Sequence, residues 1–214
     1  MQNGRFFSLD GIDGAGKSTQ LALFCQWLRE QGHDVVTCRD PGSTALGEAV
    51  RGLLLDRHEL AIGSRTEMLL YMAARAQLVE EFIRPALARG ATVVSDRFLL
   101  ANVVYQAHAG GLPVDETWDV GRIATGGLQP DLTLVLDLDV AVAWSRLNRE
   151  PDRIEARGPE FLNRVRTGFH AEAARQPGRI VLIDASRSIE AVQATVRAAA
   201  VGHVVRGSPD PAHL

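Results

Sequence analysis

The sequence lacks the features that mark secreted, metal-stabilised or membrane-spanning proteins. It has only two cysteines, Cys25 and Cys38, and no C-x-x-C pair or His/Cys cluster, so neither a disulfide framework nor a zinc site is expected. No apolar run approaches the ~18 residues that a membrane span needs, and the N-terminus has no apolar segment of the signal-peptide kind. These absences predict a cytoplasmic protein without a membrane partner.

An excess of charge of one sign is also missing. The formal net charge is −3 over 214 residues, which argues against a broad nucleic-acid-binding surface and requires any anion site to be local. Lysine itself is nearly absent, because Lys17 is the one lysine among the 23 lysines and arginines of the chain. Arginine can replace lysine on most solvated surfaces, so a lysine at this single position indicates a local requirement for it.

What the sequence does contain is an alternation of short apolar strands with helical segments. Strands are predicted at 5–10, 34–39, 91–96, 132–138 and 179–184, and helices at 17–30, 44–55, 64–90 (kinked or divided near Pro85), 98–109, 115–125, 160–175 and 188–200. This order predicts a five-stranded parallel sheet with helices on both faces. No linker or repeat divides the chain, so we expect one α/β domain over 1–205 and a disordered tail over 206–214.

The single lysine lies in the segment GIDGAGKS, residues 11–18, which fits the phosphate-binding pattern G-x-x-x-x-G-K-[ST] between a strand and an amphipathic helix. The glycines let backbone N–H groups point at phosphate oxygens, and the helix adds its positive N-terminal dipole. Lys17 can reach the β- and γ-phosphates of a nucleotide, and Ser18 can bind Mg²⁺. The predicted ATP-binding residues are Gly11, Asp13, Gly14, Ala15, Gly16, Lys17, Ser18 and Thr19. The predicted fold is therefore a three-layer α/β fold of the P-loop type.

Two other classes of P-loop protein fit the sequence poorly. A switch GTPase needs a guanine-reading N-K-x-D motif, and the only lysine of this chain is already used in the P-loop. An ATPase motor usually has a longer sheet and arginines that contact a neighbouring subunit. Phosphoryl transfer to a small acceptor remains, and its site should lie beyond the carboxyl ends of the strands. Polar residues collect at those ends, at 10–18, 39–41, 96–97 and Asp137.

Seven segments in the same order resemble bacterial thymidylate kinases, which make dTDP from dTMP and ATP. They are GIDGAGKSTQ (11–20), RDPGST (39–44), VRGLLLD (50–56), YMAARAQLVEEFIRPAL (71–87), VVSDRF (93–98), PDLTLVLDLD (130–139) and DRIE (152–155), and the resemblance covers roughly residues 5–198. It implies a three-layer P-loop kinase fold and ATP-dependent phosphorylation of dTMP in dTTP biosynthesis, with Mg²⁺ as cofactor and a homodimer as the assembly.

The resemblance also implies a binding site for the thymine base. Tyr71 and Arg75 are four residues apart and share one helix face, where the ring would stack on thymine and the guanidinium would contact its O4. Asn102, Tyr105 and Gln106 fall on one face of the next helix; an amide can pair with the base edge, and the tyrosine would lie against the sugar. From spacing alone, both tyrosines could equally be core residues and Arg75 a solvated one.

The acceptor phosphate would be bound by Arg97, because arginine is suited to bidentate phosphate recognition. By resemblance, Asp96 lies near the Mg²⁺ or orients Arg97, and Asp13 lies near the 3′-hydroxyl and phosphate of the acceptor. Asp40 and Arg51 are expected to line the same pocket.

An arginine-rich stretch follows the fourth predicted strand. Its arginines (Arg146, Arg149, Arg153 and Arg157) recur at three- to four-residue spacing, although Pro151 argues for a broken segment, and a solvated helix face would explain them in isolation. The resemblance implies a lid over the ATP phosphates at about 146–158. The P-loop has Gly14 where some relatives carry the catalytic arginine, so the lid is expected to supply it. The predicted catalytic set is Lys17, Arg97, Arg149 and Arg153, with Glu155 close to the last two.

Two alternatives to a dTMP kinase stay open from the sequence. Phe98, Tyr71 and the acceptor loop DPGST (40–44) depart mildly from the family pattern, which leaves room for a kinase of another nucleoside monophosphate or of several. A non-enzymatic module that binds a nucleoside triphosphate to regulate a partner would not need the second polar set around Arg75 and Arg97.

Overall fold

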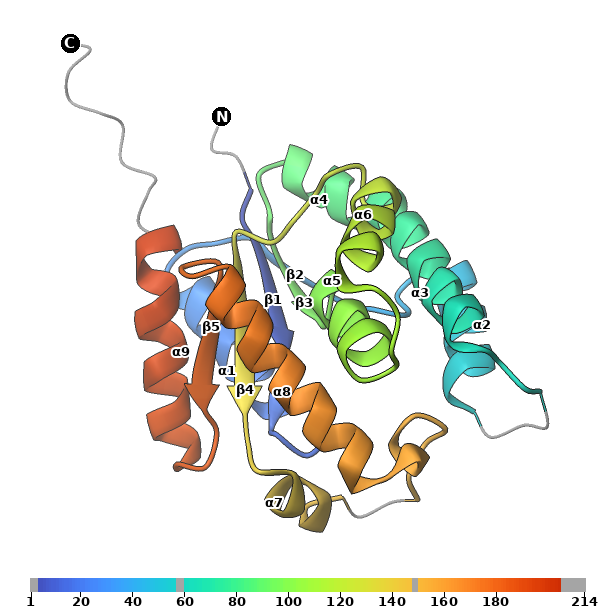
Figure 1. Cartoon of the computed structure of the whole chain (residues 1–214). Coiled ribbons are helices and arrows are strands. Elements are labelled where there is room, and N and C mark those ends of the chain that lie inside the picture. Colours follow the sequence, from blue (N-terminus) through green and yellow to red (C-terminus); the bar gives the residue numbers. More distant parts are fainter. Residues whose placement is uncertain (1–3, 57–59, 148–149, 205–214) are drawn as a thin grey trace.

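The computed structural model describes residues 4–56, 60–147 and 150–204, and these form a single parallel sheet with helices on both of its faces (Figure 1). The strands are β1 (Phe6–Asp10), β2 (Val35–Arg39), β3 (Thr92–Asp96), β4 (Leu132–Asp137) and β5 (Ile180–Asp184). Each lies within one residue of its predicted bounds, which confirms the predicted fold class. The tail predicted at 206–214 lies outside the described residues.

The strand order is β2-β3-β1-β4-β5, so β1 lies in the middle of the sheet. Its register places Leu9 beside Asp96 of β3 and Leu134 of β4. All five residues of β1 are buried, as expected for a strand covered on both faces by helices. The loop that leaves the carboxyl end of β1 therefore emerges from the centre of the sheet, between β3 and β4.

The helices form the two outer layers. They are α1 (Lys17–Glu30), α2 (Ala45–Leu55), α3 (Ser64–Leu78), α4 (Arg84–Ala88), α5 (Leu99–Asn102), α6 (Val114–Ala124), α7 (Val140–Ser145), α8 (Pro159–Arg175) and α9 (Ile189–Val204). Helices α1 and α9 pack together on one face of the sheet, and α8, α5 and α3 lie on the other side (Figure 1). Within the three described ranges, no helix is both long and apolar enough to cross a membrane.

Two of the predicted helices are interrupted by π-helical turns, which the sequence prediction did not include. Residues 64–88 divide into α3, the π turn η1 (Val79–Ile83) and α4, so the predicted division near Pro85 is confirmed, with the turn just before the proline. Residues 99–108 divide into α5 and the π turn η2 (Val103–His108). Single π turns are common at functional sites, and η2 carries Tyr105 and Gln106.

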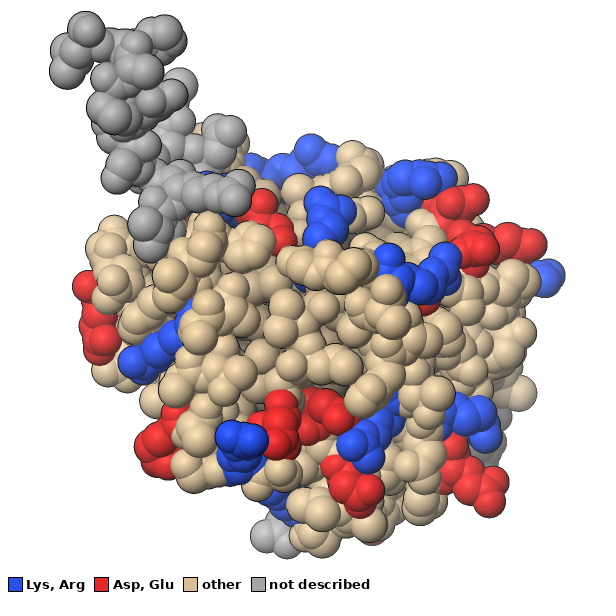
Figure 2. Space-filling model, turned by 60° about the vertical axis from the view of Figure 1, so that its left-hand side comes forward, with Lys and Arg blue, Asp and Glu red and all other residues tan. Residues whose placement is uncertain are grey.

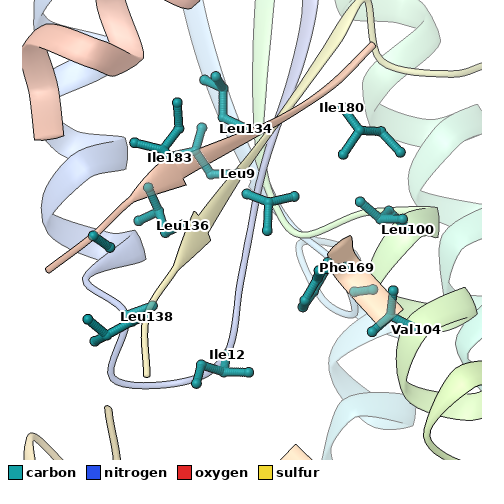
Figure 3. Close-up of a cluster of buried hydrophobic side chains, with 14 of the residues drawn as sticks. Leu9, Ile12, Leu100, Val104, Leu134, Leu136, Leu138, Phe169, Ile180 and Ile183 are labelled. Carbon is teal, nitrogen blue, oxygen red and sulfur yellow. The ribbon is translucent and has the colours of Figure 1, made fainter. Parts of the chain in front are cut away.

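The largest hydrophobic cluster joins the sheet to α5, η2 and α8 (Figure 3). Leu9, Leu134 and Ile183 lie on the side of the sheet that faces α1, whereas Ile180 of β5 lies on the other side with Leu100 of α5, Val104 of η2 and Phe169 of α8 (Figure 3). The cluster therefore includes side chains on both faces of the sheet, and η2 and α8 pack on one of them. Both cysteines are free and buried, as core residues would be, and burial raises the pKa of Cys25 to about 11.

Charged side chains are scattered over the molecule. On the face drawn in Figure 2, small groups of acidic and basic residues lie around a broad uncharged area. The prediction that the protein has no nucleic-acid partner stays a prediction.

Candidate active site

A cavity of about 530 Å³ opens beyond the carboxyl ends of β1, β2 and β3, where the parallel sheet was expected to bind its ligand. The predicted residues that line it are Asp13, Gly14, Gly16, Lys17, Ser18, Thr19, Asp40, Arg51, Tyr71, Arg75, Asp96, Arg97, Asn102, Tyr105 and Gln106. Three other predicted residues (Gly11, Ala15 and Arg153) are not part of the lining, and Arg149 lies outside the described residues. One cavity thus joins the predicted donor and acceptor residues.

The P-loop at one end of the cavity depends on glycine for steric reasons. Gly11 and Gly14 have φ values of 132° and 82°, which disfavour residues with a side chain. A Cβ on Gly14 would lie 2.2 Å from the carbonyl oxygen of Ala143 in α7, and one on Gly11 would lie 2.6 Å from that of Leu136. An arginine at position 14 would therefore require α7 to move, which agrees with the absence of a P-loop arginine.

Lys17, the first residue of α1, is held on the inner side of this loop. Its ammonium donates to the carbonyl oxygens of Gly11 (3.2 Å) and Ile12 (3.1 Å) and to Oδ1 of Asp13 (2.9 Å). Burial, followed by the charge of Arg97, lowers the pKa of Lys17 from its ordinary value. Three acceptors on the inner side of the P-loop thus fix the position of the lysine.

Arg97 connects this loop to the acceptor side of the cavity. It follows β3 with a φ of 65°, which is unusual for a residue other than glycine, and donates to the carbonyl oxygen of Gly11 and to Oδ1 of Asp13, both at 2.8 Å. Its guanidinium carbon lies 5.3 Å from the centre of the Tyr105 ring.

Asp13 is therefore shared by Lys17 and Arg97. Burial alone would raise the pKa of Asp13, but the two cations hold it well below its ordinary value. Burial would likewise lower the pKa of Arg97, yet Tyr105, Asp13 and nearby carboxylates raise it. The three groups form a charged cluster between the two halves of the cavity.

Two carboxylates at the ends of β1 and β3 have oxygen atoms without a partner. Asp10 is fully buried; its Oδ2 accepts a hydrogen bond from Ser8 Oγ (2.7 Å), and its Oδ1 has no partner. Oδ1 of Asp96 is also buried without a partner. Burial raises the pKa of Asp10 to about 6, although Ser8, Arg97 and Lys17 oppose this shift. Such oxygens, with the hydroxyl of Ser18 in the cavity wall, are the donor set that Mg²⁺ prefers.

The other end of the cavity is built around Arg75, which is only 1% exposed. Its Nε donates to Oδ2 of Asp40 (2.6 Å), and one terminal nitrogen donates to Oδ1 of Asn102 (2.9 Å). Burial raises the pKa of Asp40, although Arg75 opposes the shift. Arg75 is therefore not a solvated helix residue, and that alternative is wrong.

The two tyrosines lie at the edge of this polar pocket. Tyr71 is half-buried and lines the cavity one helical turn before Arg75. Tyr105 packs its ring against Phe161 and Phe169 of α8, but it also lines the cavity, and its buried hydroxyl has no hydrogen-bond partner. Tyr105 thus belongs both to the core and to the cavity wall.

The acceptor loop positions further polar groups at the cavity. Thr44 caps α2 by accepting a hydrogen bond from the N–H of Gly47 (2.9 Å), and α2 carries Arg51, whose guanidinium donates to the carbonyl oxygen of Pro41 (3.1 Å). Arg39 also lines the cavity and pairs with Glu48 at the surface. Pro41 and Arg39 were not predicted as site residues, although both lie in the RDPGST segment.

The lid segment, which we define as residues 146–158, is not one helix. The described part holds a capping box: Oδ1 of Asp152 accepts from the N–H groups of Ile154 and Glu155, and Oε2 of Glu155 accepts from the N–H of Asp152, each at 2.8 Å. These bonds fold DRIE into a turn that leads into the short 3₁₀ helix η3 (Glu155–Arg157). Carboxylate oxygens of Asp13, Asp152 and Glu155 lie within 4.8 Å of one another, but all three residues are engaged in the bonds already described.

The lid arginines point in different directions. Arg146 lines the cavity, whereas Arg153 donates from Nε to the carbonyl oxygen of Leu54 (2.6 Å) and from a terminal nitrogen to Glu67. Arg157 also donates to Glu67 (2.7 Å). Arg153 thus faces α2 and α3 in this structure, and its predicted catalytic role stays a prediction.

Glu67 was missed at the sequence level. It is fully buried in α3 and binds Arg153, Arg157 and Gln106. The signal that could have found it is the four-residue spacing of 67, 71 and 75, which places a carboxylate on the helix face that carries the predicted base-binding pair.

Comparison with known proteins agrees with this geometry. The family model of thymidylate kinase matches residues 9–196. The chain is 48% identical to a thymidylate kinase of Rhodopirellula baltica over 91% of this chain and 79% of that one, and 49% identical to a thymidylate kinase of Chromohalobacter salexigens over 92% and 95%. The crystal structure of thymidylate kinase from Ehrlichia chaffeensis superposes with a TM-score of 0.73 at 30% identity and covers 91% of this chain and 97% of that chain. The chain belongs to the thymidylate kinase family.

Proposed function

We propose that the protein is a phosphotransferase that moves the γ-phosphoryl group of ATP to dTMP, giving dTDP for dTTP biosynthesis. The observation that carries the proposal is the single cavity that joins a P-loop to a buried pocket of amides, an arginine and an aromatic ring. A nucleotide sensor would need only the first of these two ends. The family membership of the chain supports the same activity.

At the donor end, the N–H groups of the P-loop and the ammonium of Lys17 would bind the ATP phosphates. Ser18 would hold Mg²⁺, and Asp96 would lie near the ion or orient Arg97. The unpartnered oxygen of Asp10 supports this position for a cation. Mg²⁺ held there would supply positive charge that neutralises part of the charge of the phosphate groups. Asp13 would act through its bonds to Lys17 and Arg97, which align the donor and acceptor ends.

At the acceptor end, Arg97 would bind the dTMP phosphate in a bidentate manner. Tyr71 would stack on thymine, and Arg75 would donate to its O4 from a position fixed by Asp40 and Asn102. The other predicted contacts are the amides of Asn102 and Gln106 at the base edge, Tyr105 at the sugar, and Asp40 and Arg51 in the pocket wall.

Transfer itself would require little covalent chemistry from the protein. The acceptor phosphate is already an anion, so catalysis consists of positioning the two phosphates and stabilising the charge that spreads over the moving group. Lys17 and Arg97 are placed for this work, and Arg149 and Arg153 remain the proposed lid arginines. Arg146 joins them as a candidate because it lines the cavity.

The organisation of the protein is also a proposal. We expect a single domain over 1–205, a cytoplasmic location and a homodimer. Leu46 and Leu53 of α2 and Leu69 of α3 are between 36% and 50% exposed, and such apolar residues on adjacent helices suit a subunit interface. Light scattering of the full chain would measure the assembly.

A substrate panel tests the proposed activity. Purified protein is assayed with ATP and Mg²⁺ against dTMP, dUMP, dCMP, dGMP and AMP by coupling ADP release to NADH oxidation. We expect dTMP to give the highest kcat/KM. Higher turnover of another monophosphate would reassign the acceptor, and nucleotide binding without transfer to any of them would favour a regulatory module.

A further inference from the structure

Glu67 connects two parts of the molecule that lie far apart in sequence. Its carboxylate accepts from Nε2 of Gln106 (2.8 Å) through Oε1, and from the guanidinium groups of Arg153 and Arg157 through Oε2. It is fully buried but does not line the cavity. Glu67 therefore lies behind the base pocket and contacts both that pocket and the lid segment.

On the pocket side, the carboxylate fixes the orientation of two amides. An ionised carboxylate only accepts hydrogen bonds, so Gln106 must turn its NH₂ group toward Glu67. The oxygen of Gln106 then faces Asn102 and accepts from its Nδ2 (2.6 Å). This leaves the oxygen of Asn102 facing Arg75, from which it accepts (2.9 Å). Each step of this chain has one allowed direction, which is set at one end by Glu67, which only accepts, and at the other end by Arg75, which only donates.

On the lid side, the same carboxylate anchors the turn that carries the arginines. Arg153 and Arg157 are four residues apart, and the capping box between Asp152 and Glu155 folds the intervening backbone so that both reach Glu67. The backbone N–H of Arg153 also donates to the carbonyl oxygen of Leu55 (3.1 Å) at the end of α2. The described part of the lid is thus fastened to α2 and α3 through this one acidic residue and two carbonyl groups.

We propose that Glu67 is a positioning residue that couples lid placement to base recognition. Its charge orients Gln106 and Asn102 so that the pocket matches thymine, and the same charge holds residues 152–157 against α3. The proposal rests on the proposed function for the identity of the base. The coupling of the lid segment to α3 can be measured without any turnover.

The base-selection half follows from hydrogen-bond direction. Thymine presents an acceptor at O4, whereas cytosine presents a donor in the same place, at N4. An amide chain with a fixed direction can favour only one of these patterns. A glutamine at position 67 has one oxygen and one NH₂ group, so it cannot accept from Gln106 and from the lid arginines at the same time. Where it accepts from the arginines, Gln106 loses its partner and can turn either end of its amide toward the base, while Arg75, which only donates, keeps Asn102 in place. Discrimination against cytosine should then weaken.

The test compares Glu67→Gln with Glu172→Gln. Glu172 in α8 is equally buried and also has several donors (His108, Trp118 and Arg175), but it lies outside the cavity wall, so it controls for the loss of a buried charge. Affinities for dTMP and dCMP are measured by calorimetry, and amide hydrogen exchange is followed in the peptide that covers 150–158. Glu67→Gln should reduce the dTMP to dCMP affinity ratio by about tenfold or more and accelerate exchange in that peptide by about tenfold, because both depend on the fixed charge. Glu172→Gln should change neither.

An unchanged affinity ratio, or unchanged exchange at 150–158, would overturn the proposal. Arg157→Gln keeps the charge of Glu67 and its bond to Gln106, so it should accelerate exchange at 150–158 by a smaller factor and leave the affinity ratio unchanged. This variant provides the test if Glu67→Gln does not fold, because unchanged exchange, or a reduced affinity ratio, would contradict the assigned role of Glu67. Wild-type protein that fails to phosphorylate dTMP would refute the proposed function, whereas the exchange comparison would still report on the link between α3 and the lid segment.

Discussion

Asp10 should make the protein less stable at neutral pH than an uncharged side chain of the same shape. The residue is fully buried in the central strand, and only one of its oxygens has a protein partner, the hydroxyl of Ser8. Replacing it by asparagine keeps the volume and removes the charge. We therefore expect Asp10→Asn to stabilise the nucleotide-free protein while weakening its catalysis, as is common for groups placed to bind a ligand.

The size of the effect follows from the pKa of this carboxyl. Burial raises the pKa from 3.8 to about 6, so between these values the folded protein holds a proton that the unfolded chain has released. The contribution of Asp10 to the free energy of unfolding is fully present below the pKa of the unfolded chain, and it is lost as the pH rises through about 6. A difference of about 2 pH units corresponds to about 3 kcal/mol at 1.36 kcal/mol per unit. Asp10→Asn should avoid this loss.

Urea unfolding followed by circular dichroism at pH 4.5, 6.0 and 7.5 would measure the effect. Above pH 7, Asp10→Asn should exceed the wild type by up to about 3 kcal/mol, and the two proteins should converge toward pH 4. Asp119→Asn, at an exposed position on α6, is the matched control and should shift stability by less than about 0.5 kcal/mol. If the difference between Asp10→Asn and the wild type does not vary with pH, the assignment of a buried, destabilising charge to Asp10 is wrong.

Three further substitutions test other parts of the site. Arg75→Met leaves the buried carboxylate of Asp40 without its cation, so the free energy of unfolding measured in urea should fall by about 3–5 kcal/mol. The double variant Arg75→Met/Asp40→Asn should recover much of this loss. A loss under about 1 kcal/mol in Arg75→Met would contradict the argument. Tyr105→Phe removes a buried hydroxyl that has no partner, so the free energy of unfolding should stay within about 0.5 kcal/mol of the wild-type value. The preference for dUMP over UMP in the coupled assay should fall. An unchanged preference would show that Tyr105 does not contact the sugar. Lys17→Arg should reduce kcat by about 10²-fold or more because the guanidinium cannot occupy the position of the ammonium, and near-normal activity would refute that argument.

Much of the fold could be predicted because its signals are local. The five strands are short apolar runs bounded by turn residues, and the P-loop is a contiguous pattern whose glycines have a steric cause at Gly11 and Gly14. The cavity-lining face of α3 could be predicted in part, because Tyr71 and Arg75 lie one helical turn apart. The π turn η2 could not be predicted, since a spacing of 3.6 residues describes 98–109 as one ordinary helix.

The features that the sequence did not predict depend on pairs that are distant along the chain. Arg153 reaches a carboxylate 86 residues earlier, and no periodicity reports such a pair. A run of arginines also fits several environments, because each guanidinium can bind a phosphate, a carboxylate or water. Only the fold decides that Arg146 faces the cavity while Arg153 and Arg157 face Glu67.

The contrast between these arginines and Lys17 explains why the chain keeps one lysine. The guanidinium of arginine is planar and has five donors, so it can bind a carboxylate or phosphate from one side. Arg97 and Arg157 bind carboxylates in this way. Under the P-loop, the acceptors are two carbonyl oxygens and one carboxylate oxygen grouped around a single point, 2.9–3.2 Å from one nitrogen. A compact ammonium with three donors fits this arrangement, whereas a guanidinium would need the backbone to open around it. The three acceptors around Lys17 therefore suit an ammonium and not a guanidinium, which is the argument that Lys17→Arg tests.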